Sequence, residues 1–463
     1  MSRLSGFPEH TPAERIVELA VLDHLRATFE LHGFGSVETR AVEPLDVLLR
    51  KGEIDKEVYV VKRLQGADDE AASLALHFDL TVPFARYVVE NASRLEFPFR
   101  RYQIQKVWRG ERPQQGRFRE FTQADIDIVA RDVLRPHFDV EIAQVMAEAL
   151  DGVIALVGTD GAQATLQVSN RKVLEGFYLG LGVADPTAVM QVVDKLDKLP
   201  GEKIVALLLE QGLDQAQAES CLALAEIATP DTSFVERVRA LGVEHPLLDE
   251  GLAELAQVVG SVRATERVVV LADLRIARGL DYYTGTVFET RLSGYEQLGS
   301  ICSGGRYDQL AADNRSTYPG VGISLGVSRL LAALLADGVT ASRTVPSAVL
   351  VAVSDEDTRA EADAVAHALR SRGIPTEVAP AAAKFGKQIR HAERRGIPYV
   401  FFPADSRPRP GSTPAEGVTS HTVKDIRSGE QVEADPATWT PAPDELRPQI
   451  VRPITPNQQE STP

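Results

Sequence analysis

A dense run of arginines lies between Phe99 and Phe121. Seven basic residues stand against two acids there, giving a local net charge of +5. Guanidinium groups keep their charge at all physiological pH values and can donate two parallel hydrogen bonds to the oxygens of one phosphate. The run therefore predicts a site for a polyanion. The basic residues are Arg100, Arg101, Lys106, Arg109, Arg112, Arg117 and Arg119, and the acids are Glu111 and Glu120.

Two strand-like segments, at about 99–109 and 118–129, flank a turn-rich linker at 111–116. They predict a β-hairpin whose tip can close over a ligand. Because alternate residues of a strand share one face, the second segment presents an aromatic ring, an amide and two carboxylates together. That face, suited to a base and an ammonium or imidazole group, carries Arg119, Phe121, Gln123, Asp125 and Asp127. The alternative is a solvated hairpin with ordinary surface ion pairs.

A second cluster is the string Arg-Gly-Leu-Asp-Tyr-Tyr-Thr-Gly at 278–285. Glycines permit close approach of backbone to a ligand, and the hydroxyls of Tyr282 and Tyr283 offer polar contacts on an apolar wall. Arg278 is suited to developing phosphate charge. A tight turn with its aromatics packed in the core is the alternative.

Glycine-rich segments follow at 303–308 and 320–330, the latter a strand that leads into a helix near Arg329. Their spacing matches neither the dinucleotide fingerprint nor the phosphate-binding loop, so nucleotide chemistry here requires another fold. The segment 370–400 is also basic, with a net charge of +5. If helical, it presents Lys384, Lys387, His391 and Arg394 on one face, as a solvated surface or a nucleic-acid contact.

Length and composition limit the classes of protein to which this chain can belong. The chain has 463 residues, a prior of about three domains, and a net charge of −16, which argues against bulk coating of nucleic acid. Two cysteines with no metal-binding spacing predict no metal site from protein motifs. We expect no membrane contact and a cytoplasmic location, because neither a signal peptide nor a membrane-spanning segment is evident.

The hydrophobic pattern divides the chain into alternating helix and strand regions. A long helix is expected from Thr11 to Gly33, then a sheet-forming region to about 130, a helix at 137–156 and a strand at 164–168. Helices without strand signals occupy about 171–262, and further strands are expected at 267–271, 286–292 and 320–325. From 346 the alternation of strands and helices predicts a small α/β domain, and the tail from 435 is expected to be disordered.

The motifs together closely resemble histidyl-tRNA synthetase, a class II aminoacyl-tRNA synthetase. The resemblance covers about residues 6–430 and is most specific in the strings Arg-Gly-Leu-Asp-Tyr-Tyr and Gly-Gly-Arg-Tyr-Asp. It rests on residues 78–86, 106–113, 116–121, 278–285, 304–308 and 320–329.

The resemblance implies an α/β architecture with an α+β catalytic domain. An antiparallel class II sheet of six to seven strands, flanked by helices, would be interrupted by a helical insertion that reaches tRNA and followed by a C-terminal α/β anticodon-binding domain. The expected boundaries are 1–170 and 263–340 for the catalytic domain, 171–262 for the insertion, 346–434 for the anticodon-binding domain and 435–463 for the tail. The family works as a homodimer.

The resemblance also assigns site residues by position. Catalysis falls to Arg109 and Arg278 at the α-phosphate. Histidine binding matches Asp79, Leu80, Thr81, Gln123, Asp127, Tyr282 and Tyr283. ATP binding matches Arg109, Glu111, Arg117, Phe121, Arg278 and Arg329. Two departures from the usual pattern are His77 in place of arginine and Ser328 in place of glutamate.

The implied activity is histidine–tRNA ligation: L-histidine and ATP, with Mg²⁺, give histidyl-adenylate and pyrophosphate, and histidine then passes to the 3′ end of its tRNA. ATP is a substrate, and no prosthetic group is expected. One alternative is a synthetase-like regulatory subunit of ATP phosphoribosyltransferase, although such relatives generally lack the anticodon domain and lose catalytic positions. Another is a noncatalytic tRNA-sensing module.

Overall fold

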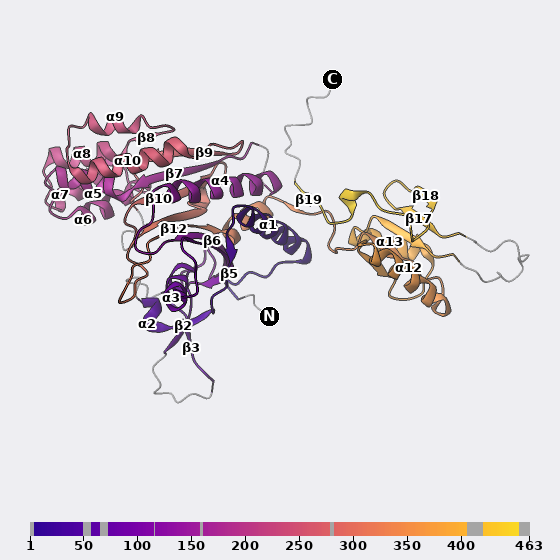
Figure 1. Cartoon of the computed structure of the whole chain (residues 1–463). Helices are drawn as coiled ribbons and strands as arrows, with labels where there is room; N and C mark the ends of the chain where they lie inside the picture. The colour runs from indigo at the N-terminus through magenta and orange to yellow at the C-terminus, as the bar shows by residue number, and fades with distance from the viewer. Residues whose placement is uncertain are drawn as a thin grey trace, which may run out of the picture. The chain divides into compact units, whose positions relative to one another are not determined.

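The structure is a computed structural model that describes residues 4–49, 57–64, 73–114, 116–157, 161–277, 282–404 and 420–452. The chain forms two compact units (Figure 1). The first comprises residues 1–9 and 21–336, and the second comprises residues 10–20 and 337–463. Helix α1 (Pro12–Leu31) ends before Gly33, whose φ of +80° suits the glycine that stops it.

A mixed, mainly antiparallel sheet forms the centre of the first unit. Its strand order in the described residues is β1-β5-β6-β12-β11-β10-β7-β9-β8. The strands are β1 (Gly35–Ser36), β5 (Phe99–Trp108), β6 (Glu120–Val129), β7 (Ala164–Asn170), β8 (Ala228–Thr229), β9 (Val268–Asp273), β10 (Thr286–Leu292), β11 (Cys302–Tyr307) and β12 (Gly320–Gly326). The antiparallel class II architecture is therefore confirmed.

The expected strand count is too small. The described sheet has nine strands because two-residue strands, β1 and β8, extend its edges. Such short strands carry no alternation that a sequence pattern can reveal. Two pairs, β1 with β5 and β7 with β9, are parallel.

The central strands have one apolar and one polar face. Along β6, Ala124, Ile126 and Ile128 are fully buried, as alternation predicted. Helices α4 (His137–Val157) and α11 (Val327–Ala336) pack on this strand. The alternate positions of β6 are therefore left to form a polar surface.

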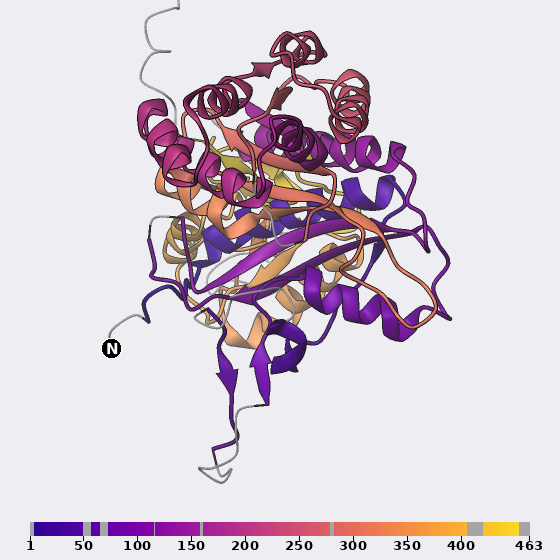
Figure 2. The ribbon, with the colours of Figure 1, turned by 90° about the vertical axis from the view of Figure 1, so that its left-hand side faces the viewer.

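A small sheet, ordered β2-β4-β3, and two helices precede β5 in the chain. In Figures 1 and 2 this sheet projects away from the large one. The elements are β2 (Val42–Pro44), α2 (Leu45–Leu48), β3 (Val60–Val61), β4 (Leu74–Leu76) and α3 (Thr81–Asn91). The turn between β4 and α3 carries Asp79.

Helices predominate between β7 and β9, as the sequence predicted for about 171–262. Figure 1 shows them gathered beside β7, β8 and β9. They are α5 (Arg171–Gly180), α6 (Pro186–Val193), η2 (Asp194–Asp197), α7 (Gly201–Glu210), α8 (Gln215–Ala225), α9 (Phe234–Arg239) and α10 (Pro246–Ser261). A short 3₁₀ helix, η3 (Glu296–Leu298), follows β10.

The second unit contains a five-stranded sheet in the order β15-β14-β16-β17-β18. Its elements are β14 (Val349–Val351), η4 (Glu356–Thr358), α12 (Arg359–Ser371), β15 (Thr376–Val378), α13 (Phe385–Arg395), β16 (Tyr399–Phe402), β17 (Thr422–Asp425) and β18 (Gln431–Glu433). The alternation of β14, α12, β15, α13 and β16 confirms the expected α/β domain.

The expectation of a disordered tail from residue 435 is wrong for residues 435–452. Trp439 packs edge-on against Tyr399, with ring centroids 5.3 Å apart. η5 (Pro443–Glu445) follows, and β19 (Ile450–Val451) pairs with β13 (Thr340–Ala341). Arg372 also donates to the carbonyls of Pro436, Thr438 and Trp439. A polar, proline-rich composition does not reveal such contacts, because they depend on residues distant in the sequence. Residues 453–463 lie outside the described residues.

Helices long and apolar enough to cross a membrane are absent from the described ranges.

Candidate active site

Two adjoining cavities open on the polar face of the central strands. The first, of about 110 Å³, is lined by carboxylates and tyrosines, and the second, of about 230 Å³, is lined by arginines. Arg109, Gln123, Ser303 and Ser324 line both cavities, so the two form one continuous site. We call them the carboxylate cavity and the arginine cavity.

Strand register builds the floor of the carboxylate cavity. Arg101 on β5 pairs with Asp127 on β6, which pairs with Gly322 on β12, which in turn pairs with Gly305 on β11. A Cβ on Gly322 would lie 2.2 Å from Asp127 Oδ1, and a Cβ on Gly305 would lie 2.9 Å from the Tyr283 ring. Glycine is needed at both positions because any side chain would collide with these cavity walls.

Asp127 is held by two partners inside the carboxylate cavity. Its Oδ2 lies 2.7 Å from Nη2 of the fully buried Arg101. Its Oδ1 accepts a 2.7 Å hydrogen bond from the Tyr307 hydroxyl. Burial raises the pKa of Asp127, while Arg101 and Tyr307 oppose that shift. The arrangement fixes a carboxylate in one orientation at the floor of the cavity.

A second buried carboxylate lies two residues away on the same face. Burial raises the pKa of Asp125 to about 7, and the neighbouring Asp127 adds to this shift, while Arg101 opposes it. Gln123 completes this strand face and donates a 2.7 Å hydrogen bond to Ser324 Oγ. Alternation in the sequence therefore placed the polar face of β6 correctly.

The turn before α3 supplies another wall of the carboxylate cavity. Asp79 and Thr81 line it, and Asp79 Oδ1 accepts a hydrogen bond from the Val82 amide at 3.1 Å. Leu80 lies between them with a fully buried side chain and is not among the residues lining either cavity.

His77 supports this same turn. The ring is fully buried and stacks on Trp108, with centroids 5.6 Å apart. Its Nε2 lies 2.7 Å from the Lys106 carbonyl oxygen, and burial lowers the pKa of His77. A neutral imidazole thus packs beneath the turn and links the end of β4 to β5.

The two tyrosines of the 278–285 string close the carboxylate cavity. Their ring centroids lie 4.3 Å apart, and both rings line the cavity. Tyr283 is buried, which raises its pKa well above the ordinary value and keeps its hydroxyl protonated. Tyr283 also belongs to a buried apolar cluster, against which Tyr282 packs, so the two rings pack in the core and line the cavity at the same time. Arg278 and Asp281 lie outside the described residues.

Arginines in the arginine cavity are held by backbone carbonyls. Arg109 donates from Nε to the Phe78 carbonyl at 3.0 Å, and its guanidinium lies 5.1 Å from the centre of the Phe121 ring. Arg329 donates to the carbonyls of Gly116 and Ser300 at 3.2 and 2.6 Å. A carbonyl orients a guanidinium without cancelling its charge, so these groups remain suited to an anion.

The hairpin tip and a buried acid complete the arginine cavity. Arg117 lies 3.4 Å from Glu111, and both residues line the cavity with Phe121. Glu289 on β10 is buried, lies opposite Ser303 in the strand register, and lines the same cavity. Ser328 Oγ accepts a 2.9 Å hydrogen bond from the Thr122 amide, which fixes the start of α11 against β6. The serine therefore supports the packing of α11.

Comparisons with known proteins agree with this geometry. A family model described as histidyl-tRNA synthetase matches residues 6–330, and one described as an anticodon-binding domain matches residues 347–435. The chain is 56% identical to histidine–tRNA ligase of Cutibacterium acnes over 97% of this chain and 98% of the relative. It is 57% identical to that of Micrococcus luteus, with the same coverage.

The chain belongs to the histidyl-tRNA synthetase family. A crystal structure of histidyl-tRNA synthetase from Nostoc sp. PCC 7120 superposes with a TM-score of 0.80 at 33% identity, covering 94% of this chain and 96% of that one. A Bacillus halodurans structure titled as an ATP phosphoribosyltransferase regulatory subunit/histidyl-tRNA synthetase has a TM-score of 0.69 at 19% identity over 84% of this chain and 96% of that one, a likeness of fold alone.

Sequence reasoning missed several residues that the histidyl-tRNA synthetase fold brings to the site. Arg101 was counted only among basic residues, since its position opposite Asp127 depends on the register of β5 and β6. Tyr307 stands in the Gly-Gly-Arg-Tyr-Asp string, so a signal was present. Ser303 and Ser324 lie in the glycine-rich segments at 303–308 and 320–330, whereas nothing in the sequence pointed to Glu289.

Proposed function

We propose that the chain activates L-histidine with ATP and then transfers histidine to the 3′ end of its cognate tRNA. The observation that carries the proposal is the junction of the two cavities. A carboxylate- and tyrosine-lined cavity continues into an arginine-lined one, and Arg109 and Gln123 line both. An amino acid in the first and ATP in the second would meet at Arg109, where the new bond forms.

The carboxylate cavity is matched to histidine. Asp79, Thr81 and Gln123 receive the α-ammonium group, and Asp127 with Tyr283 contacts the imidazole nitrogens. Asp127 is suited to this role because Arg101 and Tyr307 hold it in one orientation. An analogue without ring nitrogens would leave these buried groups unpaired, which is an effective means of discrimination.

The arginine cavity is matched to ATP. Arg109 binds the α-phosphate, Phe121 stacks on adenine, and Arg329 binds at the γ-phosphate end, with Glu111 and Arg117 on the hairpin beside the nucleotide. Arg278, the second α-phosphate arginine by resemblance, lies outside the described residues, and its role rests on the family motif alone.

In the first step an oxygen of the histidine carboxylate attacks the α-phosphorus. The new O–P bond forms as the bond to the bridging oxygen of the β-phosphate breaks, and pyrophosphate leaves. No general base is needed because the nucleophile is already ionised. Negative charge builds on the α-phosphate in the transition state, so a fixed arginine there lowers the barrier more than it stabilises the ground state.

In the second step the terminal ribose hydroxyl of tRNA attacks the carbonyl carbon of the adenylate. The ester bond forms, AMP leaves with its phosphate oxygen, and the hydroxyl proton passes to a phosphate oxygen or to solvent. Groups on the phosphate side that favour adenylate formation also favour AMP as a leaving group, because both reactions place negative charge on the α-phosphate.

Magnesium fits this site as a companion of the nucleotide. Groups of three or more metal-ligating side chains are absent from the described part of the chain. Mg²⁺ commonly binds through substrate phosphates, waters and one or two carboxylates, and the carboxylates lining the arginine cavity are Glu111 and Glu289. When bound, the ion would neutralise phosphate charge.

The second unit is matched to the anticodon arm. Lys387 and Arg394 are exposed on α13, with His391 half-buried beside them, and the exposed Lys384 lies at the N-cap directly before the helix. Lysine and arginine side chains near phosphates give affinity that falls as salt rises. We place the enzyme in the cytoplasm as a homodimer, for which light scattering should return twice the mass of one chain.

Charging of tRNA distinguishes this proposal from the regulatory-subunit alternative. The match to an anticodon-binding domain and the retained arginine cavity both support the ligase. Purified protein with ATP, Mg²⁺ and labelled histidine should form acid-stable histidyl-tRNA. Binding of histidine without any charging of tRNA from a related bacterium would contradict the proposal.

A further inference from the structure

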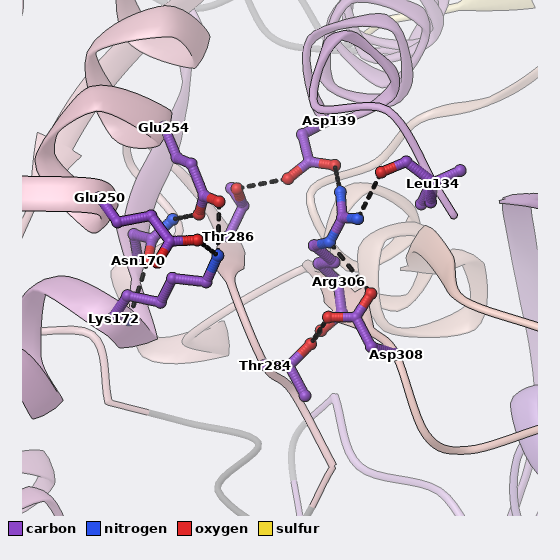
Figure 3. Close-up of polar contacts among 10 residues, drawn as sticks. All are labelled: Leu134, Asp139, Asn170, Lys172, Glu250, Glu254, Thr284, Thr286, Arg306 and Asp308. Carbon is purple, nitrogen blue, oxygen red and sulfur yellow. Dashed lines mark hydrogen bonds and ion pairs between the residues drawn. The ribbon is translucent and has the colours of Figure 1, made fainter. Parts of the chain in front are cut away.

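Arg306 lies next to the carboxylate cavity but not in it. Its chain neighbours Gly305 and Tyr307 line the cavity, and since side chains alternate along β11, Arg306 faces the other way. Its guanidinium makes three polar contacts (Figure 3). Nη1 lies 3.1 Å from Asp139 Oδ1, Nη2 donates to the Leu134 carbonyl at 2.6 Å, and Nε donates to Asp308 Oδ1 at 3.2 Å.

Both carboxylates held by Arg306 also contact the segment that follows the tyrosines. The Thr284 hydroxyl donates to Asp308 Oδ2, and the Thr286 hydroxyl donates to Asp139 Oδ2 at 2.6 Å (Figure 3). The Thr284 amide also donates to the Arg306 carbonyl at 2.8 Å. One guanidinium therefore fixes, through two carboxylates, the two threonines directly after Tyr283.

Helix α5 holds the same segment from another side. The Arg171 amide donates to the Gly285 carbonyl at 2.8 Å, and Arg171 Nη1 donates to the Tyr283 carbonyl at 3.2 Å. The next residue, Lys172, pairs with Glu250 of α10 at 2.7 Å. Figure 3 shows Lys172 with Glu250 and Glu254 beside the Arg306 contacts. Each residue from Tyr283 to Thr286 is thus bonded to Arg306, its two carboxylates or Arg171.

This placement matters because the tyrosine rings form one wall of a cavity of about 110 Å³. In a site of that size a displacement of about 1 Å in a positioning group can cost up to about a hundredfold in rate or affinity. Arg306 itself is not among the residues lining either cavity. Its effect must therefore pass through the backbone of the tyrosine segment.

We infer that Arg306, through Asp139 and Asp308, is a positioning residue that sets the tyrosine wall of the histidine site without touching either substrate. The inference rests on the proposed assignment of the carboxylate cavity to histidine. It requires a selective effect: loosening Arg306 impairs histidine binding, whereas ATP binding in the arginine cavity is little changed.

Two pairs of variants test the inference. Arg306→Lys retains the charge but loses the forked geometry, and we expect about a tenfold rise in the KM for histidine with less than a twofold change in the KM for ATP. Thr284→Val removes one hydroxyl at nearly constant volume, and we expect about a threefold rise in the same constant. Thr284→Ser retains the hydroxyl, and its KM for histidine should match that of wild type.

Arg100→Lys is the matched control, because Arg100 pairs with Glu141 at 2.7 Å on the edge-side strand β5 and lines neither cavity. For Arg100→Lys, the KM for histidine and the KM for ATP should both stay within twofold of wild type. Calorimetric histidine binding is measured for every variant beside pyrophosphate exchange, so the inference is tested even without exchange. If wild type binds histidine but shows no exchange, the proposed function fails. The inference is then tested by the histidine affinities of the variants alone.

The inference fails if folded Arg306→Lys and Thr284→Val bind histidine like wild type, or if the constants for both substrates change equally. If Arg306→Lys does not fold, the comparison of Thr284→Val with Thr284→Ser decides the question. Equal histidine affinity in those two folded variants overturns the inference.

Discussion

The two cavities of the site hold their charges in different ways. In the carboxylate cavity, Asp127 is fixed by a buried guanidinium and a tyrosine hydroxyl, all on paired central strands. In the arginine cavity, Arg109 and Arg329 are fixed by backbone carbonyls from turns and a hairpin. A small amino acid is selected by buried groups that have few alternative partners, whereas phosphates are bound by guanidinium groups that the backbone holds in position.

The largest predicted effect separates the cavities directly. Arg109→Ala removes the guanidinium proposed for the α-phosphate, and we expect histidine-dependent pyrophosphate exchange to fall by about 10²–10³-fold or more, as for lost oxyanion donors. Histidine affinity, measured by calorimetry, should change far less, because the partners of Asp127 remain in place. A loss of histidine affinity as large as the loss of rate would break the comparison.

Arg101→Met should affect stability first. It leaves Asp127 buried without its charged partner, and breaking such a pair typically costs about 3–5 kcal/mol. The free energy of unfolding in urea measures this cost. The double variant Arg101→Met with Asp127→Asn should regain part of the stability, since an uncharged amide needs no counter-charge. Equal stability of the single and double variants would contradict the pairing.

The buried carboxyl of Asp125, also in the carboxylate cavity, should make the free energy of unfolding depend on pH. Its pKa of about 7 in the folded protein exceeds the ordinary value of 3.8, so the folded state binds the proton more tightly than the unfolded state. Its contribution to stability therefore falls as pH rises from about 4 to 7. Between pH 5 and pH 8 wild type should lose about 2–3 kcal/mol relative to Asp125→Asn. Parallel urea-unfolding profiles for the two proteins would refute this assignment.

Ser328→Ala should have the smallest effect. It removes the acceptor of the Thr122 amide and leaves a buried N–H unpaired, at a cost of about 1–2 kcal/mol in unfolding free energy. Exchange activity should stay within about threefold, because Arg329 keeps its own contacts to the Gly116 and Ser300 carbonyls. A much larger loss of exchange would show that the serine acts on ATP rather than on the packing of α11.

Local patterns predicted much of this structure. The residues of β10 match the strand expected at 286–292, and the alternate positions of β6 lie at the site as proposed. Single-segment periodicity decides such features, so they can be read without knowing the tertiary fold.

Features that depend on pairing between distant segments could not be predicted. Arg101 meets Asp127 only through the register of β5 and β6, and Arg306 meets Thr284 only through the antiparallel pairing of β10 with β11. The polar composition of residues 435–452 predicts disorder, although Trp439 packs on Tyr399 in the structure. Composition and periodicity do not record which partner a side chain finds.

The most direct measurement of the central claim is ATP–pyrophosphate exchange with each of the twenty amino acids in turn. If the carboxylate cavity selects histidine and the arginine cavity holds ATP, exchange will occur with histidine and stay near background with the others. Absence of histidine-dependent exchange in folded protein with Mg²⁺, or equal exchange with an amino acid that lacks ring nitrogens, would contradict the account.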